Sequence, residues 1–284
     1  MKESPRLIEI KQDKPGFDRF IGSWLCLGEV IVVIDVGPAN SAGRLLEALA
    51  SMNIDHVDYV LLTHIHLDHA GGLAAFLDGF PMAKAVCHER GLKFMADPSR
   101  LWAGSLQVLG ELAEMYGRPS PVSLQSLIPH TKAGIQGLDI IETPGHAPHH
   151  LSYHWQGHLF AGEAGGNLFR VQDREYLRGA TPPRFLLSET LSSVDRLRAL
   201  DNQPIFYAHF GRADNSHQML DRFRAQLLRW QEIIEAEISL GRPQDLEHRC
   251  VNALLAQDPE LDAFKLMDVP TQDRERYFIG NSVR

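Results

Sequence analysis

Three histidines and a carboxylate lie within six consecutive positions, and these residue types at this spacing predict a metal site. They occupy the run THIHLDHAGG, as His64, His66, Asp68 and His69. Imidazole and carboxylate ligands together suit zinc, manganese or iron. Because a buried polar group is costly without a partner, four adjacent ones indicate a shared partner. Pairing His64 with His66, and Asp68 with His69, offers half the ligands of two neighbouring ions.

The element that must present these side chains is the apolar run just before them. Residues 57–62 are β-branched and aromatic, which predicts a buried strand. Side chains alternate along a strand, so His64, His66 and Asp68 are expected to leave its end on one side. His69 is then expected to point elsewhere.

Three further candidate ligands each follow a predicted strand, where a rigid scaffold presents loop residues for chemistry. His146 comes after residues 138–141 and a Pro-Gly turn, and it is the predicted third ligand of the first ion. His209 ends the strand predicted at residues 204–208 and would complete the second ion. Glu163 lies where an apolar strand runs into glycines that allow close backbone approach, and it is predicted to bridge both ions.

With these residues in place, the chain resembles the metallo-β-lactamase-fold hydrolase superfamily, close in pattern to its glyoxalase II and lactonase branches. The likeness covers roughly residues 17–212 and includes the early strand and turn at residues 34–37, with His64, His66, Asp68, His69, His146 and His209 at the family's motif positions. It implies an α/β fold, a four-layer αββα sandwich. His150 matches a later family position. It is a candidate to contact and orient a metal-binding residue without binding the metal itself. One departure stands out, because the bridging residue is usually Asp and here it is Glu163.

The resemblance implies a dinuclear metal-dependent hydrolase acting on a small acyl substrate, which can be a thioester, an ester or a lactone. A hydroxide bridging two divalent ions would attack the acyl carbon. Asp68 is expected to orient the attacking water and relay its proton to the leaving group. Zinc is the favoured metal, with iron and manganese as alternatives.

Three other functions stay open on the sequence. A mononuclear iron dioxygenase acting on a thiol or persulfide would use fewer of these ligands. The presence of Asp68, His69 and His209 argues against it, since one ion does not need a complete second ligand set. A phosphodiesterase uses the same fold, and a non-catalytic metal-binding protein would explain Glu163 as a sign of lost function.

Composition narrows the class of protein further. The 284 residues are 44% hydrophobic and carry a formal net charge of −8, which disfavours a nucleic acid partner. The three scattered cysteines form no C-x-x-C pair, and this pattern fits reduced thiols in a reducing compartment better than a disulfide framework. The longest apolar stretch, residues 30–34, is too short to span a bilayer. We therefore expect a cytoplasmic protein with a small-molecule substrate and no membrane contact, with a homodimer as an open alternative.

The alternation of strand and helix patterns predicts the organisation of the chain. A catalytic domain is expected over residues 1–212, with a helical insertion at about 98–126, and a C-terminal helical extension over 213–284 packed on it. Further helices are expected at residues 42–50, 190–200, 215–240 and 246–256. The tail after residue 257 shows no clear element. No role is assigned to His88 or His130.

Overall fold

The computed structural model describes residues 4–183 and 185–283, which divide into two compact units. The first unit holds residues up to 13, 18–142 and 149–156, and the second holds 14–17, 143–148 and the residues from 157 onward. The domain boundary expected at residue 212 stays a prediction.

The first unit is built on a six-stranded sheet. Its strands follow the chain in the order β1 (Arg6–Glu9), β2 (Gly22–Cys26), β3 (Val32–Ile34), β4 (Tyr59–Leu61), β5 (Lys84–Cys87) and β6 (Leu127–Pro129). The first three strands pair antiparallel, and β3 to β6 pair parallel. Parallel strands are usually covered on both faces, and the uninterrupted burial of β3 fits that rule.

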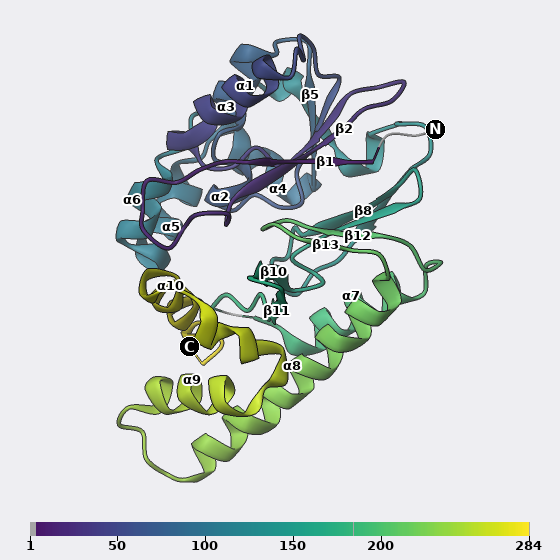
Figure 1. The fold of residues 1–284 in the computed structure, drawn as a ribbon. Coiled ribbons are helices and arrows are strands. Elements are labelled where there is room, and N and C mark those ends of the chain that lie inside the picture. Colours follow the sequence, from purple (N-terminus) through teal and green to yellow (C-terminus); the bar gives the residue numbers. More distant parts are fainter. Residues whose placement is uncertain (1–3, 184, 284) are drawn as a thin grey trace. The chain divides into compact units, whose positions relative to one another are not determined.

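Helices and a pair of antiparallel strands complete the first unit. The helices are α1 (Ala42–Ser51), α2 (Leu67–Ala70), α3 (Leu73–Gly79), α4 (Glu89–Ala96), α5 (Ser99–Leu109) and α6 (Glu111–Tyr116), with 3-10 turns at Ala39–Ser41, Leu124–Ser126 and His130–Lys132. Helices α1 and α3 lie side by side (Figure 1). Strands β7 (Leu138–Glu142) and β8 (Leu151–Trp155) pair antiparallel. The helices expected in the insertion near residues 98–126 are confirmed as α5 and α6.

The carboxyl ends of the four parallel strands present polar side chains along one edge of this sheet. Asp35 follows β3, His64 follows β4, His88 follows β5 and His130 follows β6. Ligands of open parallel sheets bind outside this edge, so the topology of the first unit predicts where its chemistry lies.

In the residues that the structure describes, the second unit contains a three-stranded arrangement, a hairpin, four α-helices and a 3-10 helix. Strand β12 (Ile205–Tyr207) pairs parallel with β9 (His158–Gly162) and antiparallel with β13 (Arg212–Ala213). Strands β10 (Asn167–Val171) and β11 (Arg174–Arg178) form the hairpin, and α7 (Leu187–Arg198) precedes β12.

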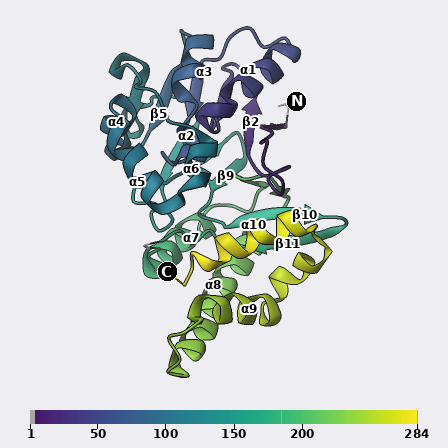
Figure 2. The same cartoon turned by 90° about the vertical axis from the view of Figure 1, so that its left-hand side faces the viewer.

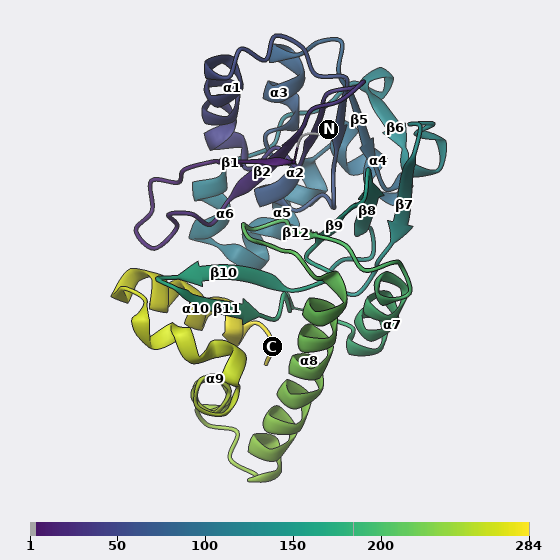
Figure 3. The same cartoon turned by 45° about the vertical axis from the view of Figure 1, so that its right-hand side comes forward.

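The C-terminal part of the second unit is helical, in the elements α8 (Ser216–Ser239), α9 (Leu246–Gln257), a 3-10 helix (Pro259–Leu266) and α10 (Val269–Gly280). Figures 2 and 3 show α10 running alongside the β10–β11 hairpin. The prediction of no clear element in the tail was wrong: α10 forms there, and it buries the charged Arg274 and Glu275 together with Ile279, so its sequence shows no continuous apolar stripe. Among the described helices, none is both long and apolar enough to cross a membrane.

Candidate metal centre

The structure gathers the seven predicted ligands into two clusters, one in each unit. The motif cluster of the first unit consists of His64, His66, Asp68 and His69. Its rings are close, since the centroid of His64 lies 4.4 Å from that of His66 and 4.0 Å from that of His69. The expected alternation beyond His66 is wrong, because residues 67–70 form the helical turn α2. That turn brings His69 against His64 instead of pointing it elsewhere.

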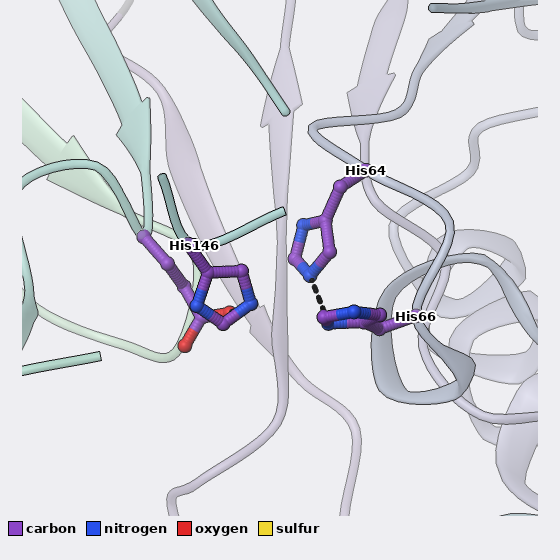
Figure 4. Close-up of side chains that lie close together, drawn as sticks. His64, His66 and His146 are labelled. Carbon is purple, nitrogen blue, oxygen red and sulfur yellow. Dashed lines mark hydrogen bonds and ion pairs between the residues drawn. The ribbon is translucent and has the colours of Figure 1, made fainter. Parts of the chain in front are cut away.

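The hydrogen bonds of Thr63 determine which nitrogen of His64 carries the proton. Asp35 accepts a 2.7 Å hydrogen bond from the Thr63 hydroxyl. Because the hydroxyl proton is used in this bond, Oγ1 of Thr63 can only accept a hydrogen bond from Nδ1 of His64, 3.0 Å away. The Nε2 atom of a neutral His64 therefore carries a lone pair. This lone pair is directed toward Nδ1 of His66 at 2.9 Å, the contact dashed in Figure 4. The pair offers two ring nitrogens converging on one position.

Asp35 also determines which nitrogen of His69, a second imidazole of the motif cluster, carries the proton. Its Oδ2 lies 2.9 Å from Nδ1 of His69, and an ionised carboxylate can only accept. Nδ1 of His69 therefore carries the proton, and Nε2 is left to bind a ligand, 3.7 Å from Oδ2 of Asp68. Metal-binding histidines are commonly oriented through such an outer carboxylate. Sequence reasoning gave residues 34–37 a place in the family pattern but no role to Asp35.

Replacing Asp35 with Asn is expected to weaken metal binding by about 10–100-fold, the usual effect of removing an outer partner. Asp35 accepts from the Thr63 amide, the Thr63 hydroxyl and His69, whereas an asparagine would turn an NH2 group toward one of these donors. The same mismatch should cost about 1–3 kcal/mol of stability. Chelator competition and urea unfolding measure the two effects. Unchanged metal affinity in Asp35→Asn would show that Asp35 does not orient the imidazoles.

The glutamate cluster of the second unit consists of His146, Glu163 and His209. A tight turn places His146. At Gly145, with φ +136°, any Cβ would lie 2.7 Å from the Cα of Thr190 on α7, so only glycine fits. Ser193 on the same helix donates to the carbonyl of Pro144 at 2.7 Å. The Pro-Gly turn is thus held against α7, as a preformed ligand position requires.

The contacts of His146 indicate that a positive charge lies between its Nε2 atom and the carboxylate of Glu163. Nδ1 of His146 lies 3.1 Å from the carbonyl oxygen of Ala180, which can only accept, so Nδ1 carries the proton. Nε2 lies 2.8 Å from Oε2 of Glu163. On a neutral ring this contact would set a lone pair against a carboxylate oxygen. A proton or a metal ion resolves that conflict, so the residues fit a divalent cation.

Glu163 offers one carboxylate oxygen to each imidazole of its cluster. Oε1 lies 3.4 Å from Nε2 of His209 and also accepts a 3.1 Å hydrogen bond from Asn167. Burial alone would raise the pKa of Glu163, yet His146 and His209 hold it well below its usual value. The carboxylate is therefore ionised, and its two oxygens are divided between two imidazoles as a bridging ligand requires.

His150 is buried, with its ring centroid 5.3 Å from that of His64. Its ring thus lies beside that of a predicted ligand. A supporting role for this ring stays a prediction.

A third group of possible donors, His88, His130 and Glu142 in the first unit, has the opposite protonation pattern. The first two N–H groups of α4 donate to these rings, from Glu89 to Nδ1 of His130 at 3.2 Å and from Arg90 to Nδ1 of His88 at 3.1 Å. Both rings therefore carry their proton on Nε2, and His130 donates it to Glu142 at 3.0 Å. A metal would need the lone pair that this proton occupies. The histidines cap a helix here.

Protonation of His88 is expected to destabilise the fold as pH falls. Burial and the neighbouring His130 lower the pKa of His88 below its ordinary 6.5, against the opposing pull of Glu142. The unfolded chain then binds the proton first, so stability is intact above about pH 6.5 and is lost as pH falls through the lowered value. His88→Asn keeps a capping acceptor without a titrating ring. Urea unfolding at pH 7.5 and 5.5 should show a smaller loss of stability in the variant than in the wild type; equal losses would show that titration of His88 is not linked to unfolding.

Comparisons with known proteins agree with this geometry. The sequence model of the metallo-β-lactamase superfamily matches residues 23–209. The chain is 27% identical to the metallo-β-lactamase fold-containing protein ST1585 of Sulfurisphaera tokodaii, over 76% of this chain and 81% of that protein. It is 30% identical to the hydroxyacylglutathione hydrolase of Aeromonas salmonicida, over 62% of this chain and 55% of the hydrolase.

Solved structures show the same fold. A metallo-β-lactamase family protein of Thermus thermophilus matches with a TM-score of 0.65 and 21% identity, covering 92% of each chain. The archaeal ST1585 structure matches with a TM-score of 0.63 and 24% identity, covering 80% of this chain and 87% of the other. The predicted α/β metallo-β-lactamase fold is thereby confirmed. With the family model matching most of its length, this chain belongs to the metallo-β-lactamase superfamily.

Proposed function

We propose that the motif cluster and the glutamate cluster together hold two divalent metal ions and that the protein hydrolyses a small acyl substrate. The observation that carries the proposal is the protonation pattern of three rings. His64, His69 and His146 each have an outer acceptor for Nδ1, which leaves Nε2 as a ligand. The pattern is reversed at His88 and His130, so it distinguishes the three rings from these two buried histidines.

The ligands divide between the two ions as the motif order suggests. One ion would take His64, His66 and His146, the other would take Asp68, His69 and His209, and Glu163 would bridge them. Zinc is the favoured metal, because nitrogen and carboxylate donors of this kind suit it, and iron or manganese are the alternatives. The longer reach of Glu163 than of Asp is matched by its separate contacts to His146 and His209.

Bound ions would supply the acidification of a water molecule and the polarisation of an acyl carbonyl. The chain itself supplies proton transfer and orientation. Asp68 retains 15% exposure of its side chain and lies 3.7 Å from His69, so it can accept a proton from water and pass it to the leaving group. Asp35 and the Ala180 carbonyl keep the imidazoles in the orientation that this requires.

An acyl substrate is favoured over a phosphodiester. Relatives of the chain include hydroxyacylglutathione hydrolases from several bacteria. The net charge of −8 opposes binding of a polyanionic backbone. We infer a small, cytoplasmic thioester, ester or lactone as the substrate.

A substrate panel tests this function. Thioesters, lactones, aryl esters and phosphodiesters should be assayed with zinc, manganese and iron, and the highest kcat/KM is expected on an acyl compound. Activity should fall in acid, because protons compete with the metal for the imidazoles. A preference for phosphodiesters would point to the phosphodiesterase branch. Oxygen uptake with thiols that outpaces every hydrolysis would identify a dioxygenase.

A further inference from the structure

The Nδ1 proton of His146 is held by a backbone carbonyl, that of Ala180, at 3.1 Å. A backbone acceptor cannot move by itself, so its position depends on what holds residues 177–181, which we call the anchor segment. This segment comprises the end of β11 and the three residues after it. Its contacts therefore determine how the imidazole is oriented.

Helix α8 holds the first half of the anchor segment. The buried amide of Gln226 donates to the carbonyl of Leu177 at 2.7 Å. Gly179 packs against the indole of Trp230, so closely that a Cβ at this position would lie 3.2 Å from the ring. The indole N–H is itself held by Asp258 at 2.6 Å. The ring is thus fixed, and the glycine backbone follows its surface.

Helix α10 and the residues after it hold the anchor segment on both sides of Ala180. Before it, Nε of Arg178 donates to Glu275 at 2.7 Å, and both side chains are buried. Arg274 donates to the other oxygen of Glu275 at 2.9 Å. After it, the hydroxyls of Thr181 and Ser282 are hydrogen-bonded. The carbonyl of Ala180 is therefore clamped between two links to the C-terminal end.

The same hairpin end also supports Glu163. Arg178 lies opposite Asn167 in the β10–β11 register, and Asn167 donates to Oε1 of Glu163 at 3.1 Å. Gly166 packs against the carbonyl of Arg178 and the ring of Phe223 on α8. Displacement of Arg178 would thus disturb the positions of both His146 and Glu163.

The ionic group at the centre of this arrangement is not in itself evidence of added stability. Burial would raise the pKa of Glu275, but Arg178 and Arg274 hold it below its usual value, so the carboxylate stays ionised. Well-packed apolar residues are often as stable as such a buried ion group or more so. Its directional hydrogen bonds instead fix the geometry of Arg178, which carries the anchor segment.

We propose that the C-terminal helices α8 and α10 form a positioning frame for the metal ligands His146 and Glu163, with Glu275 and Thr181 as positioning residues. This inference rests on the proposed metal site and adds a role for the C-terminal helices. It predicts that changes far along the chain alter the affinity and the coordination of at least one metal ion without altering any ligand.

The test compares four variants with the wild type by Zn2+ affinity, from chelator competition, and by the absorption spectrum of the Co2+-loaded protein. Glu275→Gln breaks the link at Arg178, and Thr181→Val removes only a hydroxyl. Glu237→Gln is the matched control, since Glu237 pairs with Arg249 between α8 and α9. His146→Ala removes the ligand itself. All are measured well below their unfolding temperatures.

We expect Glu275→Gln to weaken binding of one Zn2+ by about 10–100-fold and to shift the Co2+ spectrum at saturating cobalt. Thr181→Val should shift both in the same direction by a smaller factor, and it keeps the test decisive if Glu275→Gln does not fold. Glu237→Gln should match the wild type. Loss of affinity in His146→Ala with wild-type behaviour in both Glu275→Gln and Thr181→Val would overturn the positioning frame alone. A wild-type protein that binds no Zn2+ would overturn the frame and the metal site together.

Discussion

Glu163→Gln is expected to lose tight binding of the second metal ion and to reduce kcat by at least about 100-fold. Removing a supporting partner outside a metal site typically costs 10–100-fold, and loss of a bridging ligand should cost more. The amide keeps the size of the side chain but loses the charge that lies 2.8 Å from His146 and 3.4 Å from His209. Metal analysis after dialysis and a steady-state assay on the best acyl substrate measure the two effects.

Glu163→Asp is the matched control for this change. It keeps the negative charge and introduces the residue usual in the family, although its carboxylate is one methylene nearer the backbone. We expect two ions at reduced affinity and partial activity. Wild-type metal content and rate in Glu163→Gln would show that the carboxylate is no ligand, whatever Glu163→Asp does.

His66→Ala is expected to strip at least one ion and to abolish measurable hydrolysis. Its Nδ1 lies 2.9 Å from Nε2 of His64, so the two nitrogens serve one position, and removing one of the three imidazoles proposed for this ion leaves too few ligands for a tight site. Elemental analysis of the purified variant gives the ion count, and added zinc should restore little activity.

His130→Gln provides the comparison for His66→Ala, because His130 is a buried histidine beside a carboxylate that belongs to neither proposed metal cluster. Its proton lies on Nε2, so the variant should keep the full metal content and lose only stability. Full metal occupancy in His66→Ala, or loss of an ion in His130→Gln, would refute the distinction drawn between the clusters.

Several ligand candidates could be predicted from the sequence because they are polar side chains that come shortly after an apolar strand. This holds for His64 after β4 and for His209 after β12. The directions of Asp68 and His69 could not be predicted, because the pattern favoured continued alternation and the chain instead forms the short helix α2. A single turn of helix leaves too few residues for a periodic signal.

The groups that position the ligands could not be predicted from the sequence, for a different reason. The partner of His146 is a backbone carbonyl 34 residues away, and any residue type would provide one. Helix α10 was missed because two of its buried side chains, Arg274 and Glu275, are charged, which leaves no continuous apolar stripe. Burial of ions depends on partners such as Arg178, which are distant in the sequence and become neighbours only in the fold.

The protonation state of histidine is equally invisible in a sequence. His88 and His64 both follow parallel strands and are both buried. What separates them is whether Nδ1 faces a backbone N–H group, as at His88, or the hydroxyl of Thr63, as at His64. That distinction turns one histidine into a helix cap and the other into a predicted ligand.

The most direct test of the central claim is the metal content of the purified wild-type protein, measured by elemental analysis after dialysis against metal-free buffer and repeated after loading with zinc. Two divalent ions per chain, falling in both Glu163→Gln and His66→Ala but not in His130→Gln, is the predicted result. A protein that retains no ion after loading, or a single iron that neither variant displaces, would contradict the proposed dinuclear site.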